Sequence, residues 1–136
     1  MNKFSSFFPV LLLVFFVDQS SKFLAAILGF HITYNYGVSF SFMTESQPKF
    51  LTFVLFLLLY YLYMSFKSHW KRNPIATGLF FGGAVSNLFD RVIFDSVRDW
   101  VSIPFTQIQN NVADWAIFIG LVLIVQPIIF AKMNKD

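Results

Sequence analysis

The sequence contains no cysteine at any of its 136 positions. That absence excludes a disulfide framework, a thiolate nucleophile and a metal site built on thiolates. Charge is scarce as well, because charged residues make up 12% of the chain, whereas soluble domains carry about 25%. The composition therefore places the chain among membrane proteins, and its length predicts a single domain over residues 1–136.

Short motifs of several enzyme classes are missing too. The sequence has no H-E-x-x-H segment, no G-x-S-x-G nucleophile elbow, no phosphate-binding loop and no nucleic-acid module. Ser20 and Ser21 precede Lys22, but neighbouring positions on a helix do not face each other, which disfavours a Ser–Lys site. We therefore expect no cofactor and no nucleic-acid partner.

Apolar residues, in contrast, make up 57% of the chain, and phenylalanine alone occupies 20 positions. They form four runs, each near the roughly 20 residues that cross a bilayer as a helix. The runs cover about 7–28, 50–66, 74–94 and 112–130. Membrane strands would alternate, and these runs do not, so we predict an all-α membrane protein with four transmembrane helices. Asp18 and Lys22 interrupt the first run, which argues against a cleaved signal peptide.

Basic residues set the expected orientation. They precede the first run, separate the second from the third without any acid, and follow the fourth: Lys3, Lys67, His69, Lys71, Arg72, Lys132 and Lys135. By the positive-inside rule these segments are cytoplasmic, and so are both termini. The loops of about 29–49 and 95–111 then face outward. His31 and His69 would lie on opposite sides of the membrane, so they cannot share a metal ion.

The first outer loop has an alternating pattern. In residues 32–42, Val38, Phe40 and Phe42 alternate with Ser39 and Ser41. A period of two in β-favouring residues predicts a short strand or hairpin at the outer interface.

Charged and amide side chains interrupt the third run. Asn87, Asp90 and Arg91 stand at i, i+3 and i+4, a spacing that places them on one helical face. Two interpretations of these residues stay open. They can form a polar contact between helices around an Asp90–Arg91 pair, or a functional site that faces the bundle interior. Gly82 and Gly83, one turn earlier, would let another helix approach closely.

Other acids also have structural explanations. Asp18 and Lys22, four residues apart, can form a self-neutralising pair. Asn111 and Asp114 fit a capping box at the start of the fourth run. Asp99 alone would be a solvated loop acid.

The polar residues share one depth in the membrane, which favours a functional site over these separate structural explanations. They all fall in the outer leaflet or at the outer surface of the predicted arrangement. Asp90, for example, lies about 24 Å along its helix from Pro74. A carboxylate pair can divide its roles, the ionised group activating water while the protonated one polarises a carbonyl. That chemistry is peptide hydrolysis of the aspartic type. A small transporter is the rival, although the second run lacks the midplane polar groups that transport needs; a non-catalytic scaffold also stays open.

The order of the polar motifs resembles that of lipoprotein signal peptidase, also called signal peptidase II. The matching segments are DQSSK at 18–22, NYGVSFS at 35–41, GGAVSNLFDR at 82–91, VRDW at 97–100 and NVADWAI at 111–117. The resemblance implies a monomeric aspartic endopeptidase of the bacterial inner membrane with its active site on the periplasmic side. It would cut diacylglyceryl-modified prolipoproteins just before the lipidated cysteine, with membrane lipid as its other partner.

The resemblance also implies roles for individual residues. Asp99 and Asp114 would be the catalytic pair, without a metal. The supporting residues would be Asp18, Lys22, Asn35, Gly37, Asn87, Asp90, Arg91 and Asn111. Arg91 would pair with Asp90 or hold the substrate backbone, and residues 32–42 would join a small outer β-cradle. The chain departs from the family pattern at Ser86, where a second glycine is usual, and at Asn110, where phenylalanine is usual.

Overall fold

The computed structural model describes residues 6–37, 48–65 and 72–133. Its helices are α1 (Phe7–Ile27), α2 (Pro48–Ser65), α4 (Pro74–Phe94) and α5 (Val112–Met133). These helices coincide closely with the four predicted apolar runs, so the predicted helical architecture is confirmed. The start of α4 follows simple capping chemistry, because the Asn73 side chain accepts a hydrogen bond from the Ala76 N–H at 3.1 Å and Pro74 occupies the first turn.

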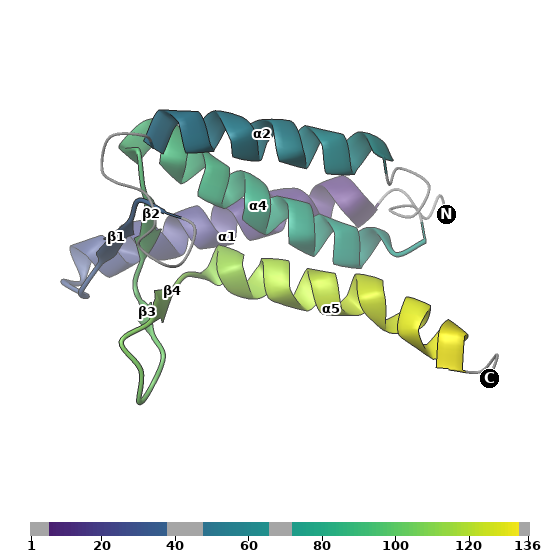
Figure 1. The fold of residues 1–136 in the computed structure, drawn as a ribbon. Coiled ribbons are helices and arrows are strands. Elements are labelled where there is room, and N and C mark those ends of the chain that lie inside the picture. The colour runs from purple at the N-terminus through teal and green to yellow at the C-terminus, as the bar shows by residue number, and fades with distance from the viewer. Residues whose placement is uncertain (1–5, 38–47, 66–71, 134–136) are drawn as a thin grey trace.

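The helices run alongside one another, and all four strands gather at one end of the bundle (Figure 1). The start of α1 and the end of α5 lie at the opposite end. Helix α4 is central, since it packs extensively against α1 and α5 and more sparsely against α2. This packing brings the polar residues near the strand end of different helices together.

Glycines explain why α4 can be central. A Cβ atom at Gly82 would lie 2.8 Å from the backbone oxygen of Leu11 in α1, and one at Gly78 would lie 2.9 Å from that of Phe7. Gly83 meets α5 in the same way, at Ala113. The predicted close approach at Gly82 and Gly83 is confirmed, and it involves a different partner helix for each glycine.

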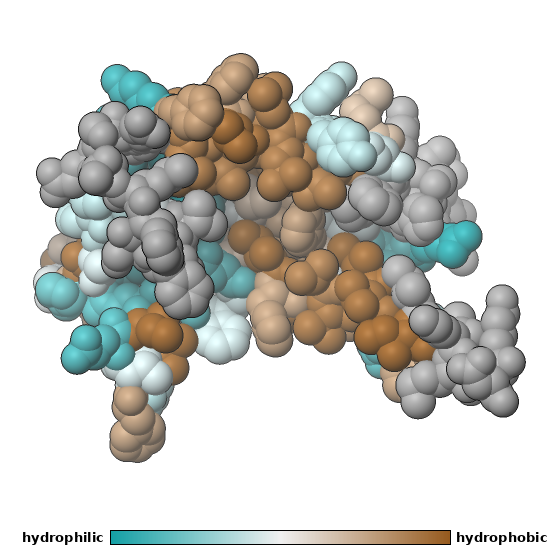
Figure 2. All heavy atoms as spheres, viewed as in Figure 1, coloured by the Kyte–Doolittle hydropathy of each residue, from teal (hydrophilic) through white to brown (hydrophobic). Residues whose placement is uncertain are grey.

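Burial is inverted relative to a soluble protein. The fully buried side chains are mostly polar, while many phenylalanines and leucines of α1, α2 and α5 are exposed. Figure 2 shows these apolar side chains along the helices and polar ones near the strand end. Helix α1 is long and apolar enough to span a membrane, whereas the apolar stretches Lys49–Ser65 and Val112–Pro127 are shorter. A lipid environment suits such a surface.

Two small antiparallel sheets form the strand end. Strand β1 (Thr33–Asn35) pairs with β2 (Val97–Asp99), which aligns Thr33 with Asp99. Strand β3 (Val101–Ser102) pairs with β4 (Gln109–Asn110). The strand predicted in the first outer loop is confirmed at β1, but its partner comes from the loop after α4. The alternating residues 38–42 lie outside the described residues.

Candidate active site

A buried cluster of four charges joins α1, α4 and β2. Lys22 Nζ lies 2.6 Å from Asp18 Oδ2 and 3.1 Å from Asp90 Oδ2. Arg98 Nη2 lies 2.8 Å from Asp90 Oδ1. The Asp18, Lys22 and Asp90 side chains have no exposed surface. The predicted Asp18–Lys22 pair is therefore confirmed, but it belongs to a larger cluster of two carboxylates and two cations.

Asp90 pairs with Arg98, not with Arg91, so the Asp90–Arg91 pair, one of the alternatives that the sequence left open, is wrong. Neighbouring positions on a helix point about 100° apart, which turns the Arg91 side chain away from Asp90. Arg98 instead donates from its backbone N–H and Nε to Asp90 Oδ2 at 3.1 and 3.3 Å, and from Nη2 to Oδ1. The Asp90 carboxylate therefore holds β2, the strand that carries Asp99, against α4.

Gln19 and Ser86 complete the cluster. Ser86 Oγ donates to Asp18 Oδ2 at 2.7 Å and accepts from Gln19 Nε2 at 2.9 Å. The Gln19 amide also donates to Asp90 Oδ1 and accepts from Arg98 Nη2. Ser86, the departure from the family pattern, therefore contributes a buried hydroxyl where glycine would have no side chain.

Asn111 connects Asp99 with Asp114. Its side-chain amide donates to Asp99 Oδ1 at 2.6 Å. Its side-chain oxygen accepts from the Asp114 N–H at 2.9 Å, and its own N–H donates to Asp114 Oδ2 at 3.3 Å. The reciprocal bonds confirm the predicted capping box at the start of α5. Asn111 therefore caps α5 and also binds the Asp99 carboxylate.

Two further asparagines orient the carboxylates. Asn35 Nδ2 donates to Asp99 Oδ2 at 3.3 Å, while the Asn35 side-chain oxygen accepts from the Gly37 N–H. Asn87 Nδ2 donates to Asp114 Oδ1 at 2.8 Å, and its oxygen accepts from Lys22 Nζ at 3.2 Å. Asp114 is therefore linked through one amide to the charge cluster.

The environment of Asp99 favours its protonated form. Burial, with only 3% of the residue exposed, and the nearby charge of Asp114 raise the pKa of Asp99 to about 6, against the opposing hydrogen bond from Asn111. The solvated loop acid considered for Asp99 is therefore wrong. A carboxyl group with this pKa can hold or release a proton near neutral pH.

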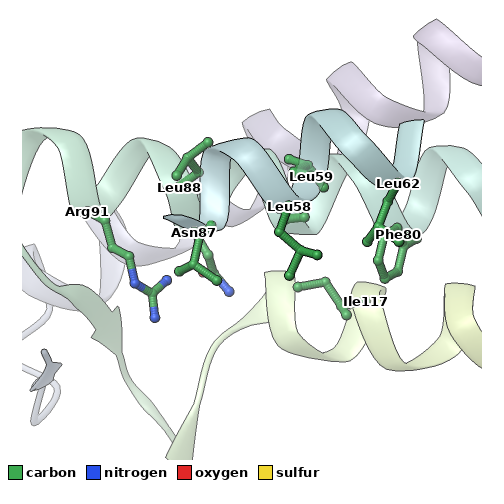
Figure 3. A pocket seen from close by; sticks show the side chains of 10 residues that line it. Leu58, Leu59, Leu62, Phe80, Asn87, Leu88, Arg91 and Ile117 are labelled. Carbon is green, nitrogen blue, oxygen red and sulfur yellow. The ribbon is translucent and has the colours of Figure 1, made fainter. Parts of the chain in front are cut away.

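Arg91 borders an apolar pocket beside these carboxylates. The pocket, of about 270 Å³, lies between α2, α4 and α5, and half of the residues that line it are leucines. Figure 3 shows the side chains of Asn87 and Arg91 at one end and Phe80 and Leu62 at the other. Arg91 Nη2 donates to the Gly37 carbonyl at 3.3 Å, whereas its buried Nε has no hydrogen-bond partner among the described residues. The Arg91 Nε–H is therefore an available donor at the end of the pocket that is closer to the carboxylates.

The structure brings together all the residues that the sequence put forward for a site. No group of three or more potential metal ligands occurs in the part of the chain that the structure describes. Sequence reasoning missed Arg98, Gln19 and Ser86. The sequence offered no local signal for Arg98, because the strand that carries it, β2, was not predicted.

Replacing Arg98 by methionine should lower thermal stability. Arg98→Met removes the Nε and Nη2 bonds to Asp90 but leaves Lys22 and the backbone N–H as partners. Loss of a hydrogen-bonded charge of this kind costs about 2 kcal/mol. Melting curves in detergent should show a clear decrease for Arg98→Met and almost none for Arg72→Met, an exposed control cation. Equal melting temperatures for all three proteins would contradict the role given to Arg98.

Comparisons with known proteins agree on one family. The sequence profile described as Signal peptidase (SPase) II matches residues 10–130. A lipoprotein signal peptidase of Shewanella sp. (strain MR-4) is 35% identical, with 93% of this chain and 88% of the relative covered. One of Helicobacter pylori (strain P12) is 34% identical, with coverages of 95% and 91%. A solved bacterial membrane enzyme structure has a TM-score of 0.72 at 21% identity, covering 96% of this chain and 92% of that one, which shows a common fold.

Proposed function

Because the chain belongs to the signal peptidase II family and is therefore a protease, we propose that it is an aspartic endopeptidase that removes signal peptides from diacylglyceryl-modified prolipoproteins. Asp99 and Asp114 form its catalytic pair. The main support is the pair of contacts made by Asn111, whose amide bonds Asp99 and whose capping bonds hold Asp114. No metal or other cofactor takes part in the proposed reaction.

In the proposed mechanism the two carboxylates share one proton, so one is ionised and the other is protonated. The ionised carboxylate takes a proton from water, and the resulting hydroxide oxygen attacks the carbonyl carbon before the lipidated cysteine. The protonated carboxylate donates its proton to the carbonyl oxygen. On collapse of the tetrahedral intermediate the C–N bond breaks and the amine leaves with the proton that was taken from water. One hydroxyl group of the intermediate returns its proton to the other carboxylate, which restores the pair. The raised pKa of Asp99 suits a group that exchanges a proton at each step.

The surroundings of the pair support substrate binding from the lipid. The leucine-lined pocket reaches from the bundle surface toward Asn87 and can hold an apolar part of the substrate. Arg91 Nε would donate to a substrate carbonyl, which satisfies a buried donor that has no partner among the described residues. All proposed site residues come from one chain, so a monomer is sufficient.

The proposed location is the bacterial inner membrane. All four helices span the bilayer, both termini are cytoplasmic, and the strand end with its carboxylates faces the periplasm. Two observations support this arrangement. The start of α1 and the end of α5 lie at the same end of the bundle, and apolar side chains are exposed along the helices.

The decisive assay is incubation of the purified protein with a prolipoprotein that carries a diacylglyceryl cysteine. We expect cleavage just before that cysteine, and none of the matched precursor without the lipid. Cleavage of neither precursor under conditions where the protein stays folded would contradict the proposed activity. Equal cleavage of both would contradict the proposed dependence on lipid.

Cysteine labelling tests the topology separately, because the chain has no cysteine of its own. Ser102→Cys at the strand end and Arg72→Cys before α4 are both at exposed positions. A membrane-impermeant thiol reagent added to intact spheroplasts should label Ser102→Cys only, while Arg72→Cys should require permeabilisation. Labelling of both variants from outside would contradict the four-span arrangement.

A further inference from the structure

The hairpin of β3 and β4 ends in a turn with an unusual residue. Thr106 N–H donates to the Ile103 carbonyl at 3.2 Å, and Ile103 N–H to the Ile108 carbonyl at 3.0 Å. Pro104 takes the second position of this turn, and Phe105 takes the third with φ +66°. A positive φ at the third position is typical of a type II turn and favours glycine or asparagine. Phenylalanine is therefore a conformationally unfavourable choice here.

The same phenylalanine is the most exposed side chain of the turn. Phe105 is wholly accessible, and Ile108 is 58% accessible. The segment from Trp100 to Ala113 contains no charged residue. Hairpins that project into water are usually protected by charges. An uncharged hairpin with a strained, fully exposed phenylalanine at its tip instead fits a partner that binds apolar side chains.

The position of the hairpin identifies that partner. In Figure 1 the hairpin projects sideways from the bundle at the level where α5 begins, with its tip beyond the helices. Figure 2 shows apolar atoms at the tip and polar ones above it. Trp115 and Phe118 in the first turns of α5 are also exposed and contact each other edge to face, with centroids 6.5 Å apart. Tryptophan and tyrosine concentrate at the headgroup level of a bilayer, so Trp115 marks this level beside the hairpin.

We infer that the tip of the hairpin, Phe105 with Ile108, inserts into the outer leaflet of the membrane beside α5. The inference rests on the membrane placement given under the proposed function. Strand β4 leads directly into Asn111, so lipid contact at the tip fixes one end of the segment that carries this asparagine. The hairpin thus anchors the outer part of the site against the membrane surface.

The test uses a single nitroxide in the otherwise cysteine-free protein, reconstituted in phosphatidylcholine–phosphatidylglycerol vesicles. Phe105→Cys, Ile119→Cys on the exposed side of α5 and Arg72→Cys are each spin-labelled. Accessibility to oxygen and to a water-soluble nickel chelate is then measured. We expect position 119 to prefer oxygen, position 72 to prefer the chelate, and position 105 to resemble 119 more than 72.

Two outcomes would overturn the inference, and they differ. Chelate exposure at position 105 with oxygen preference at 119 would reject the anchor while leaving the proposed spans intact. Chelate exposure at 119 as well would reject the membrane placement itself. Phe105→Gly provides a functional check, because glycine suits the turn and keeps the fold. This variant should match the parent in detergent but cleave more slowly in vesicles, and equal rates in vesicles would contradict a functional anchor.

Discussion

Substituting asparagine for Asp99 or for Asp114 is expected to abolish cleavage of a lipidated prolipoprotein. Each substitution removes one half of the proton exchange, and general acid–base catalysis contributes about a hundredfold to ten-thousandfold. A loss of at least about a hundredfold is therefore expected for each variant. Asparagine is nearly isosteric, and it can still accept the hydrogen bond from Asn111 or Asn87. Folding and membrane insertion should survive both changes.

Asp95→Asn is the matched control for these two variants. Asp95 ends α4 in the left-handed conformation, with φ +55°, which asparagine adopts readily. This variant should keep most of the activity. Initial cleavage rates in detergent, alongside melting curves, distinguish the cases. Substantial turnover by Asp99→Asn or Asp114→Asn would reject the proposed pair, and unfolding of both would favour a purely structural role for these acids.

The pH dependence of stability gives an independent readout of Asp99. A pKa of about 6 in the folded state exceeds the value of about 3.9 in an unfolded chain. The folded state therefore favours the protonated acid, and this stabilisation is complete below a pH of about 3.9 and is lost as the pH rises to about 6. Asp99→Asn should consequently melt at a higher temperature than the parent at pH 7.5, with a smaller difference at pH 4.5. No dependence of this difference on pH would contradict the buried-acid description.

Lys22→Met should be the most destabilising single change in the charge cluster. The lysine is fully buried and bonds both Asp18 and Asp90, so its loss leaves the cluster with one excess negative charge. Stranding a buried charge costs about 3–5 kcal/mol. We expect a large fall in melting temperature and in the yield of folded protein. Lys49→Met, at an exposed position of α2, should have almost no effect.

A double variant shows whether charge balance is the cause. Asp18→Asn combined with Lys22→Met leaves Asp90 paired with Arg98 and restores neutrality. The asparagine introduced at position 18 can still accept the hydrogen bond that the Ala113 N–H donates to Asp18. The double variant should therefore be more stable than Lys22→Met alone. A double variant that is less stable than the single one would mean that the individual contacts, and not the net charge, determine stability.

Much of the architecture was predictable because its signals are local. Apolar runs of sufficient length gave the helices, Asn111 and Asp114 gave the cap of α5, and Asp18 and Lys22 gave a pair one turn apart. Both the cap and the pair join residues no more than one helical turn apart. Local spacing was therefore enough to identify them.

The contacts of Asp90 were not predictable in the same way. Its partners Lys22, Gln19 and Arg98 come from α1 and β2, and their distances depend on how the glycines of α4 seat that helix. Adjacency in sequence suggested Arg91, but the helical rotation between neighbours directs that side chain to Gly37. Strand β1 falls within the segment 32–42 for which a strand was predicted, whereas its pairing with β2 required the tertiary fold.

The division of the four charges among segments has a consequence for biogenesis. Helix α1 carries its own ion pair and can enter the bilayer as a neutral segment. Helix α4 brings Asp90, whose ion-pair partners lie on an earlier helix and on a later strand. In the proposed membrane arrangement, a carboxylate without those partners costs up to about 3 kcal/mol. Insertion of α4 should therefore depend on α1 already being present. A chain lacking α1 is expected to integrate α4 poorly during translation into membranes, and Asp90→Asn should relieve that defect.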